Sequence, residues 1–66
     1  MKTWLKVERA KRDMTQAQLA QEMNVSTHAI NCIENRKYMP SVILAIKLAR
    51  YFGTTVEQIF FLEEDD

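Results

Sequence analysis

The chain has 66 residues, of which 47% are hydrophobic and 27% charged, so it can form one small core and is too apolar to be disordered. One Gly and one Pro favour helices over β-turns and argue against an all-β fold. The single Cys excludes an internal disulfide and, with a single His, a zinc site.

The net charge of zero hides an uneven distribution, because the chain ends in an acidic tail, Glu63–Asp66. Residues 1–62 are expected to form the domain and carry nine basic against five acidic side chains. This pattern is typical of a DNA-binding protein whose tail points away from the phosphates; a tail that only improves solubility is the alternative. No apolar run is long enough to span a membrane and no signal-peptide core follows the start, so a cytoplasmic protein is expected.

The first helix is predicted over residues 2–12, with apolar bulk from Trp4, Leu5 and Val7. Glu8 stands where an apolar neighbour is expected, which weakens the helical pattern. The first few residues could therefore be extended instead.

The second helix is predicted to begin at a capping box formed by Thr15 and Gln18 and to end near residue 23. Asn24 tolerates the left-handed conformation that ends a helix where Gly is absent. Ser26 is a good N-cap for a third helix that ends near residue 35.

The third helix is expected to have two different faces. Three apolar residues are predicted to face the core: Ala29, Ile30 and Ile33. Three small polar residues share the opposite side: Thr27, His28 and Asn31. Cys32 has no second Cys to pair with and is interpreted as a small filler rather than a redox switch.

A fourth helix is predicted from Val42 to Phe52, between the N-cap Ser41 and the terminating Gly53. Its core stripe is expected to contain Val42, Ala45, Leu48, Ala49 and Phe52. A second capping box, Thr55–Gln58, predicts a short fifth helix. Strand character in the residues that follow indicates a short ribbon between the two ends of the chain.

Two short capped helices joined by Asn24-Val25 form a helix-turn-helix. Ala20 is small where the third helix crosses closely over the second, and Ile30 and Ile33 fill the wedge between them. A chance match to all these positions, in register with two N-caps, is improbable.

Several short motifs occur together in this chain: Thr15-Gln16-x-x-Leu19-Ala20, Val25-Ser26, Ile30, Ile33-Glu34-Asn35 and Pro40-Ser41. With them the chain resembles, from about residue 5 to 60, the Cro and phage-repressor type of helix-turn-helix protein, the xenobiotic-response-element family. The resemblance implies an all-α, five-helix, lambda-repressor-like DNA-binding domain. It also implies a compact, homodimeric transcriptional repressor of bacteria or phages.

The resemblance implies DNA contacts from Gln16, Ser26, Thr27, His28, Asn31, Arg36, Lys37 and Tyr38. Those within the third helix are expected to reach base edges, and those before and after it to contact phosphates. A structural pair, Arg9 and Glu34, is expected to bridge the first helix to the end of the third.

The family usually has Gly where Asn24 and Arg36 stand here. A left-handed Arg36 would cost roughly 1 kcal/mol, while adding a charge near the phosphates. Each contact also has a simpler alternative. His28 could be only solvated, Asn31 could contact the backbone rather than adenine, and Tyr38 could pack on its own loop.

Apolar residues near the end of the chain and on the fourth helix exceed what one small core requires. Some are expected to form a homodimer interface, with Ile43, Phe60, Phe61 and Leu62 as candidates. In so small a domain they could also be core.

We therefore expect a sequence-specific transcriptional regulator that binds double-stranded DNA, with palindromic half-sites roughly 10 bp apart. The alternative is an antitoxin-like interaction module that also binds DNA and whose apolar patch holds another protein. No nucleophile–base pair, carboxylate dyad or metal cluster is evident, so we expect no enzyme, metal, cofactor, small-molecule ligand or membrane contact.

Overall fold

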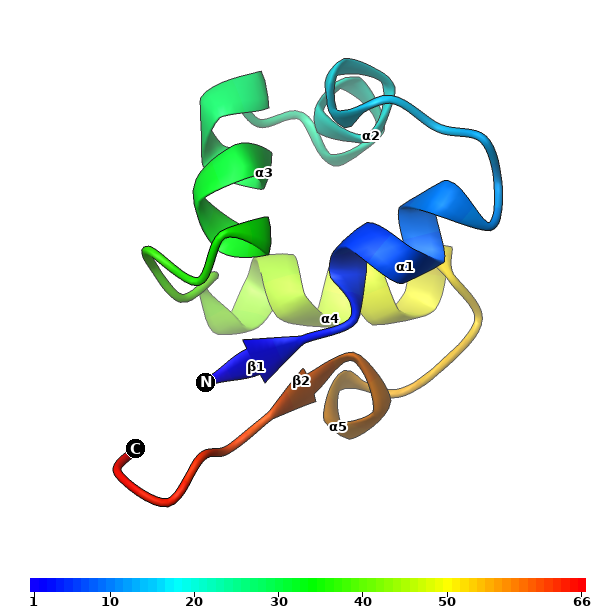
Figure 1. Cartoon of the computed structure of the whole chain (residues 1–66). Helices are drawn as coiled ribbons and strands as arrows, with labels where there is room; N and C mark the ends of the chain where they lie inside the picture. The colour runs from blue at the N-terminus through cyan, green and yellow to red at the C-terminus, as the bar shows by residue number, and fades with distance from the viewer.

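The computed structural model describes residues 1–66 and contains five helices and one two-stranded antiparallel sheet (Figure 1). The elements in chain order are β1 (Lys2–Thr3), α1 (Leu5–Ala10), α2 (Gln16–Met23), α3 (Thr27–Glu34), α4 (Val42–Tyr51), α5 (Val56–Ile59) and β2 (Phe60–Phe61). This architecture confirms the predicted five-helix fold with a terminal ribbon.

Three helices begin at side-chain caps. Thr15 and Gln18 form the complete capping box before α2: Gln18 N donates to Thr15 Oγ1 over 3.0 Å, and Thr15 N donates to Gln18 Oε1 over 2.8 Å. Ser26 and Ser41 each accept a hydrogen bond from the backbone N–H three residues later. The local sequence therefore determines where α2, α3 and α4 start.

The second predicted capping box does not form. Thr55 is the N-cap of α5, but its side chain accepts no hydrogen bond from the helix. Gln58 is hydrogen-bonded instead to the hydroxyl of Thr54. Because α5 has only four residues, its stability depends on tertiary packing, above all of the fully buried Ile59.

Four residues have a positive φ: Asp13 at 53°, Asn24 at 58°, Arg36 at 59° and Gly53 at 69°. Asn24 ends α2 as predicted, and Gly53 follows α4 as predicted. Arg36 adopts the left-handed conformation that its place in the family pattern implies, at a cost of about 1 kcal/mol. Asp13 was not anticipated, although Asp is one of the residues that tolerate this conformation.

The first helix is shorter than predicted and begins at Leu5. Lys2 and Thr3 are extended because they pair with Phe61 and Phe60 of β2. The Thr3 hydroxyl then accepts a hydrogen bond from Leu5 N over 3.1 Å. The strand at the opposite end of the chain therefore decides the conformation of the first residues.

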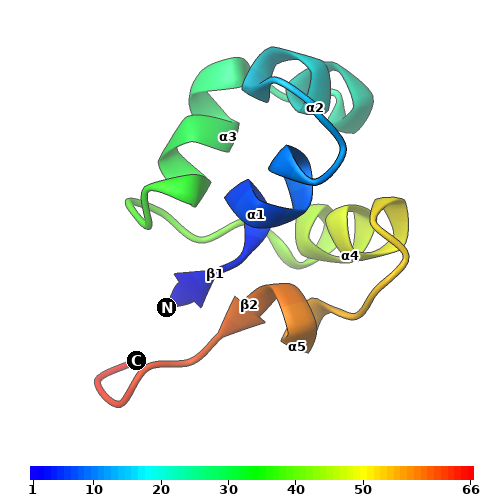
Figure 2. The same cartoon turned by 45° about the vertical axis from the view of Figure 1, so that its right-hand side comes forward.

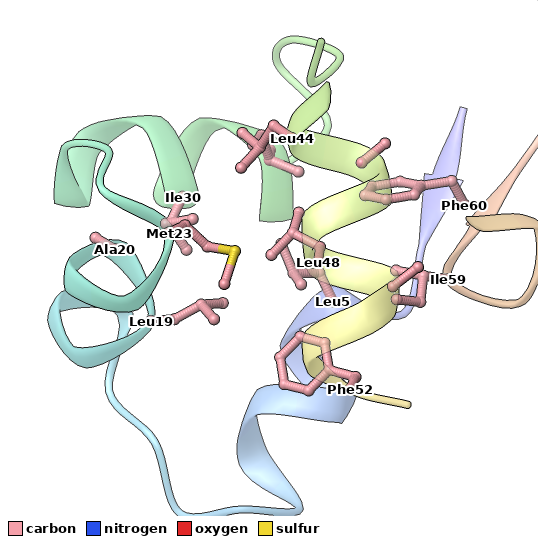
Figure 3. Close-up of a cluster of buried hydrophobic side chains, with 13 residues drawn as sticks. Leu5, Leu19, Ala20, Met23, Ile30, Leu44, Leu48, Phe52, Ile59 and Phe60 are labelled. Carbon is pink, nitrogen blue, oxygen red and sulfur yellow. The ribbon is translucent and has the colours of Figure 1, made fainter. Parts of the chain in front are cut away.

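One core lies between the helices (Figure 3). Its buried residues are Leu5, Leu19, Ala20, Met23, Ile30, Ile33, Leu44, Ala45, Leu48, Ala49, Phe52, Ile59 and Phe60. Val42 was predicted to join them but is 75% exposed, because α4 turns Leu44 to the core instead. Phe60 is only 8% exposed and belongs to this core.

The helix-turn-helix pair, α2 and α3, forms one end of the molecule, and the ribbon with both chain termini forms the other (Figures 1 and 2). Helices α1 and α4 lie between these ends. The outer side of α3 is therefore supported from behind and open to solvent.

Candidate nucleic-acid interface

Helix α3 presents a polar face to the solvent. Ile30 and Ile33 are buried and fasten the helix to the core, while Ala29 is half-buried beside them. The outer residues are exposed or half-buried: Thr27, His28, Asn31 and Cys32. The predicted division of α3 into a core face and a polar face is thus present.

A partly buried ion pair connects α1 to the end of α3, as the family resemblance implied. Arg9 Nε donates to Glu34 Oε2 over 2.8 Å, and Nη2 donates to Oε1 over 3.1 Å. The Glu34 side chain is only 2% exposed. The hydrogen bond to Glu34 raises the pKa of Arg9, which keeps the guanidinium group charged. Arg9 Nη1 also donates to the carbonyl of Met14 over 2.7 Å, which fixes the chain before α2.

Three side-chain amides, from α2, from α3 and from the residue after α3, extend from this ion pair. Gln16 Nε2 donates to Glu34 Oε1 over 3.0 Å, and Asn31 Nδ2 donates to Gln16 Oε1 over 3.4 Å. Asn35 Nδ2 then donates to Asn31 Oδ1 over 3.2 Å. The sequence predicted Gln16 and Asn31 as separate DNA contacts and missed that they are joined. It also missed Asn35, whose spacing of four residues from Asn31 was the available signal.

His28 and Cys32 lie one turn apart on the outer side of α3. His28 Nε2 is 3.4 Å from Cys32 Sγ. The imidazole therefore rests against the thiol on one side of the ring, and its other nitrogen is not part of this contact.

The loop after α3 exposes the predicted phosphate contacts Arg36, Lys37 and Tyr38. Lys37 N donates to Cys32 O over 2.8 Å, which closes the end of α3. The Lys37 side chain forms no ion pair, whereas Arg36 Nη1 lies 3.2 Å from Glu63 Oε1. Of the two cations, Lys37 is therefore the one available without displacing another group.

The acidic tail folds back instead of pointing away. Besides the contact between Glu63 and Arg36, the Asp66 carboxylate lies 2.8 Å from the amino group of Met1. The hydrogen bond from this amino group lowers the pKa of Asp66, and the same bond raises the pKa of the amino group. The tail is thus attached to the N-terminus and to one residue of the predicted DNA contact surface.

All buried side-chain nitrogen and oxygen atoms have hydrogen-bond partners. No group of three or more His, Cys, Asp or Glu side chains is placed to hold a metal ion. None of the five helices has the length and apolar character that crossing a membrane requires.

A short polar helix that follows a tight left-handed turn, and that a second helix and a partly buried ion pair hold in place, defines a helix-turn-helix protein of the DNA-binding class. Residues 5–59 match the family described as Helix-turn-helix. The chain belongs to this family, as its resemblance to Cro-type regulators implied.

Similar proteins occur in archaea and in bacteria. An uncharacterized HTH-type transcriptional regulator of Methanocaldococcus jannaschii is 46% identical, and the match covers both chains completely. A regulator of Archaeoglobus fulgidus is 42% identical over all of this chain and 93% of its own length. The regulator YgzD of Bacillus subtilis is 33% identical over the whole of both chains. This family supports a role in DNA-binding regulation and suggests a protein without catalytic activity.

Proposed function

We propose that the chain is a sequence-specific transcriptional repressor that binds a palindromic operator as a homodimer, with one α3 in each of two successive major grooves. The observation that carries the proposal is the polar outer face of α3, a helix that the ion pair between Arg9 and Glu34 fastens to α1. An α-helix fits the major groove, where each base pair presents a distinct pattern of donors and acceptors.

In this complex the N-terminal part of α3 lies deepest in the groove. Thr27 and His28 reach base edges there, and Asn31 does so one turn later. All three are accessible from the outer side of the helix. Ser26 contacts the backbone at the start of the helix, where free N–H groups favour a phosphate.

Phosphate contacts come from both sides of α3. Gln16 lies at the N-terminus of α2, whose N–H groups and dipole favour an anion. Lys37 and Tyr38 lie in the loop after α3, and Arg36 joins them when Glu63 is displaced. This displacement costs little, because the Arg36 and Glu63 side chains are 53% and 31% exposed and such surface pairs are weak.

The dimer interface in this proposal is an apolar groove of about 200 Å³ beside α4. It is lined mainly by apolar side chains from four parts of the chain: Met1, Met39, Pro40, Val42, Ala45, Ile46, Val56 and Phe60. Met39 is 67% exposed and Val42 75%. Covering such residues with the same surface of a second copy removes apolar area from water on both chains.

Of the four interface residues that the sequence suggested, Phe60 lines this groove. It is also a core residue, only 8% exposed, and lies at the bottom of the groove. Ile43 lines a second groove with Val25, and Phe61 and Leu62 line a third beside the ribbon. Ile43 is next to Val42 on α4 but outside the groove, so it serves as the control for the proposed interface.

The test is a selection of bound duplexes from a random DNA pool, followed by sedimentation of the free protein and of the complex. The proposal predicts an imperfect palindrome with half-sites roughly 10 bp apart and a complex of two chains per duplex. Recovery of a single half-site would contradict the dimer. Recovery of random sequences would contradict sequence-specific binding.

A further inference from the structure

Three side-chain amides form a hydrogen-bonded series in which each amide donates to the group before it. Gln16 donates to the carboxylate of Glu34, Asn31 to Gln16 and Asn35 to Asn31, with donor–acceptor distances of 3.0, 3.4 and 3.2 Å. Gln16 is on α2, Asn31 on α3 and Asn35 directly after α3. The series begins at a side chain that is 2% exposed and ends at an exposed residue, so it connects the interior of the protein to the surface at the end of α3.

The direction of these hydrogen bonds follows from the chemistry of Glu34, at which the series begins. An ionised carboxylate can only accept hydrogen bonds, so Gln16 must turn its NH₂ group toward Glu34. The Gln16 oxygen then faces Asn31, so Asn31 must donate to it from its own NH₂ group. The Asn31 oxygen consequently faces Asn35, whose NH₂ group donates to it. Reversing any one amide would place two donors or two acceptors against each other.

We propose that Glu34, acting through Gln16, fixes the direction in which Asn31 presents its amide to DNA, and that this fixed amide selects adenine at the base pair it faces. The inference rests on the proposed function, because it concerns base readout by α3. In it Glu34 and Gln16 are positioning residues, and Asn31 is the residue that contacts the base.

The remaining hydrogen-bonding capacity of Asn31 supports adenine. An amide has two N–H donors and two acceptor positions on its oxygen, and Gln16 and Asn35 each use one. One N–H and one lone pair remain, which match N7 and the N6 amino group of adenine. Guanine carries an acceptor, O6, where adenine carries its amino group. A fixed Asn31 would set its oxygen against O6, whereas an amide free to reverse could turn its NH₂ group there.

The decisive variant is Gln16→Met, which keeps the shape of the side chain and the ion pair between Arg9 and Glu34 but removes the amide that orients Asn31. A second variant, Glu34→Gln, replaces a group that only accepts with one that can present either end. The matched control is Gln21→Met, since Gln21 is exposed on the same helix and its side chain forms no hydrogen bond. Thermal melting identifies any variant that has lost its fold.

The measurement is selection from a random DNA pool, followed by titration of the selected duplex and of duplexes that replace one adenine at a time. The wild type and Gln21→Met should prefer adenine over guanine about 10-fold or more at one position per half-site, as a bidentate amide–adenine pair does. In Gln16→Met this preference should fall below about 3-fold at that position alone, and folded Glu34→Gln should behave similarly. Asn31→Ala should remove the same preference, which assigns the position to Asn31.

Two outcomes overturn the inference. If Gln16→Met weakens binding equally on every duplex and keeps the full preference, Gln16 is only a phosphate contact, and sequence-specific binding still stands. If the wild type shows no base preference at all, the proposed function fails and the inference with it.

Discussion

The outward faces of α3 and α4 differ in the kind of partner that each can accept. On α3 the outer side chains are polar and bonded to one another, as His28 to Cys32 and Asn31 to Asn35. On the side of α4 that lines the groove, Val42 and Ile46 are aliphatic, 75% and 42% exposed, and have no hydrogen-bonding groups in their side chains. A hydrated surface such as DNA suits the first face, and only a dry protein surface makes burial of the second favourable.

The two faces also differ in why binding an unsuitable partner would be unfavourable in free energy. Covering α3 with an apolar surface would leave its polar groups without hydrogen bonds. Covering α4 with DNA would desolvate phosphates against aliphatic groups. The difference in polarity alone can therefore direct DNA to one face of this small domain and a protein to the other. Substitutions on each face can test this.

The largest effect is expected from Val42→Glu. Val42 is the first residue of α4, where an acidic side chain favours the helix dipole, so the fold should persist. A carboxylate in the apolar groove should weaken dimerisation by about 100-fold or more, because an unpaired buried charge costs several kcal/mol. Sedimentation should show monomers. Affinity for the palindrome should fall as well, because the dimer is lost. Ile43→Glu, one residue away and outside the groove, should remain dimeric; the reverse result would move the interface to Ile43.

His28→Ala should affect the other face only. The variant should remain dimeric but lose about 1–3 kcal/mol of discrimination between the operator and random DNA, as expected for a base contact. Titration of both duplexes at one salt concentration measures this. An equal loss on the two duplexes would show that His28 contacts only the backbone, and no loss would show that it is only solvated.

Lys37→Ala should change the salt dependence of DNA binding but not that of dimerisation. Each phosphate contact contributes about one unit to the slope of log affinity against log salt concentration, so the variant's slope should be shallower by about 1. Dimerisation through aliphatic side chains should not weaken with salt in either protein. A slope equal to that of the wild type would remove Lys37 from the DNA interface.

The smallest effect is expected from a residue that belongs to neither face. The hydrogen bonds from Lys11 and then Arg12 lower the pKa of Glu8. The ionised form therefore stabilises the fold above the unfolded pKa of about 4.3, and this contribution is lost as the pH falls through the lower folded value. Glu8→Gln should lower the free energy of unfolding at pH 7 by less than about 1 kcal/mol and match the wild type near pH 2.

Denaturant titrations at several pH values provide that measurement. Glu22→Gln is the control, since Glu22 is exposed on α2 and forms no ion pair. Operator binding and dimerisation should be unchanged in Glu8→Gln. A larger difference from the wild type at low pH than at pH 7 would contradict the assigned direction of the shift.

Sequence reasoning succeeded where the cause of a structure is local. Thr15, Ser26 and Ser41 start helices through bonds that span three residues, and Asn24 turns the chain by its own conformational tolerance. The conformation of the first residues was harder to predict from the sequence. Their strand depends on pairing with Phe60 and its neighbour, which are far away in sequence. Only the folded chain brings these segments together.

Periodicity was also insufficient on α4. The helix is apolar over more than one face, so spacing alone does not decide whether Val42 or Leu44 faces the core. On the candidate site, the family resemblance identified the pair Arg9 and Glu34. The hydrogen bonds that Gln16 donates to Glu34 and accepts from Asn31 were not foreseen, because the direction of an amide depends on the groups around it.

The ribbon between β1 and β2 has a topological consequence. Because Lys2 pairs with Phe61, the polypeptide is nearly a closed ring, and its two ends lie side by side (Figure 1). A short polar linker could join them, and new ends could be opened in the exposed loop between α3 and α4. Such a circular permutant should retain the same tertiary contacts, with the order of its helices along the chain rearranged.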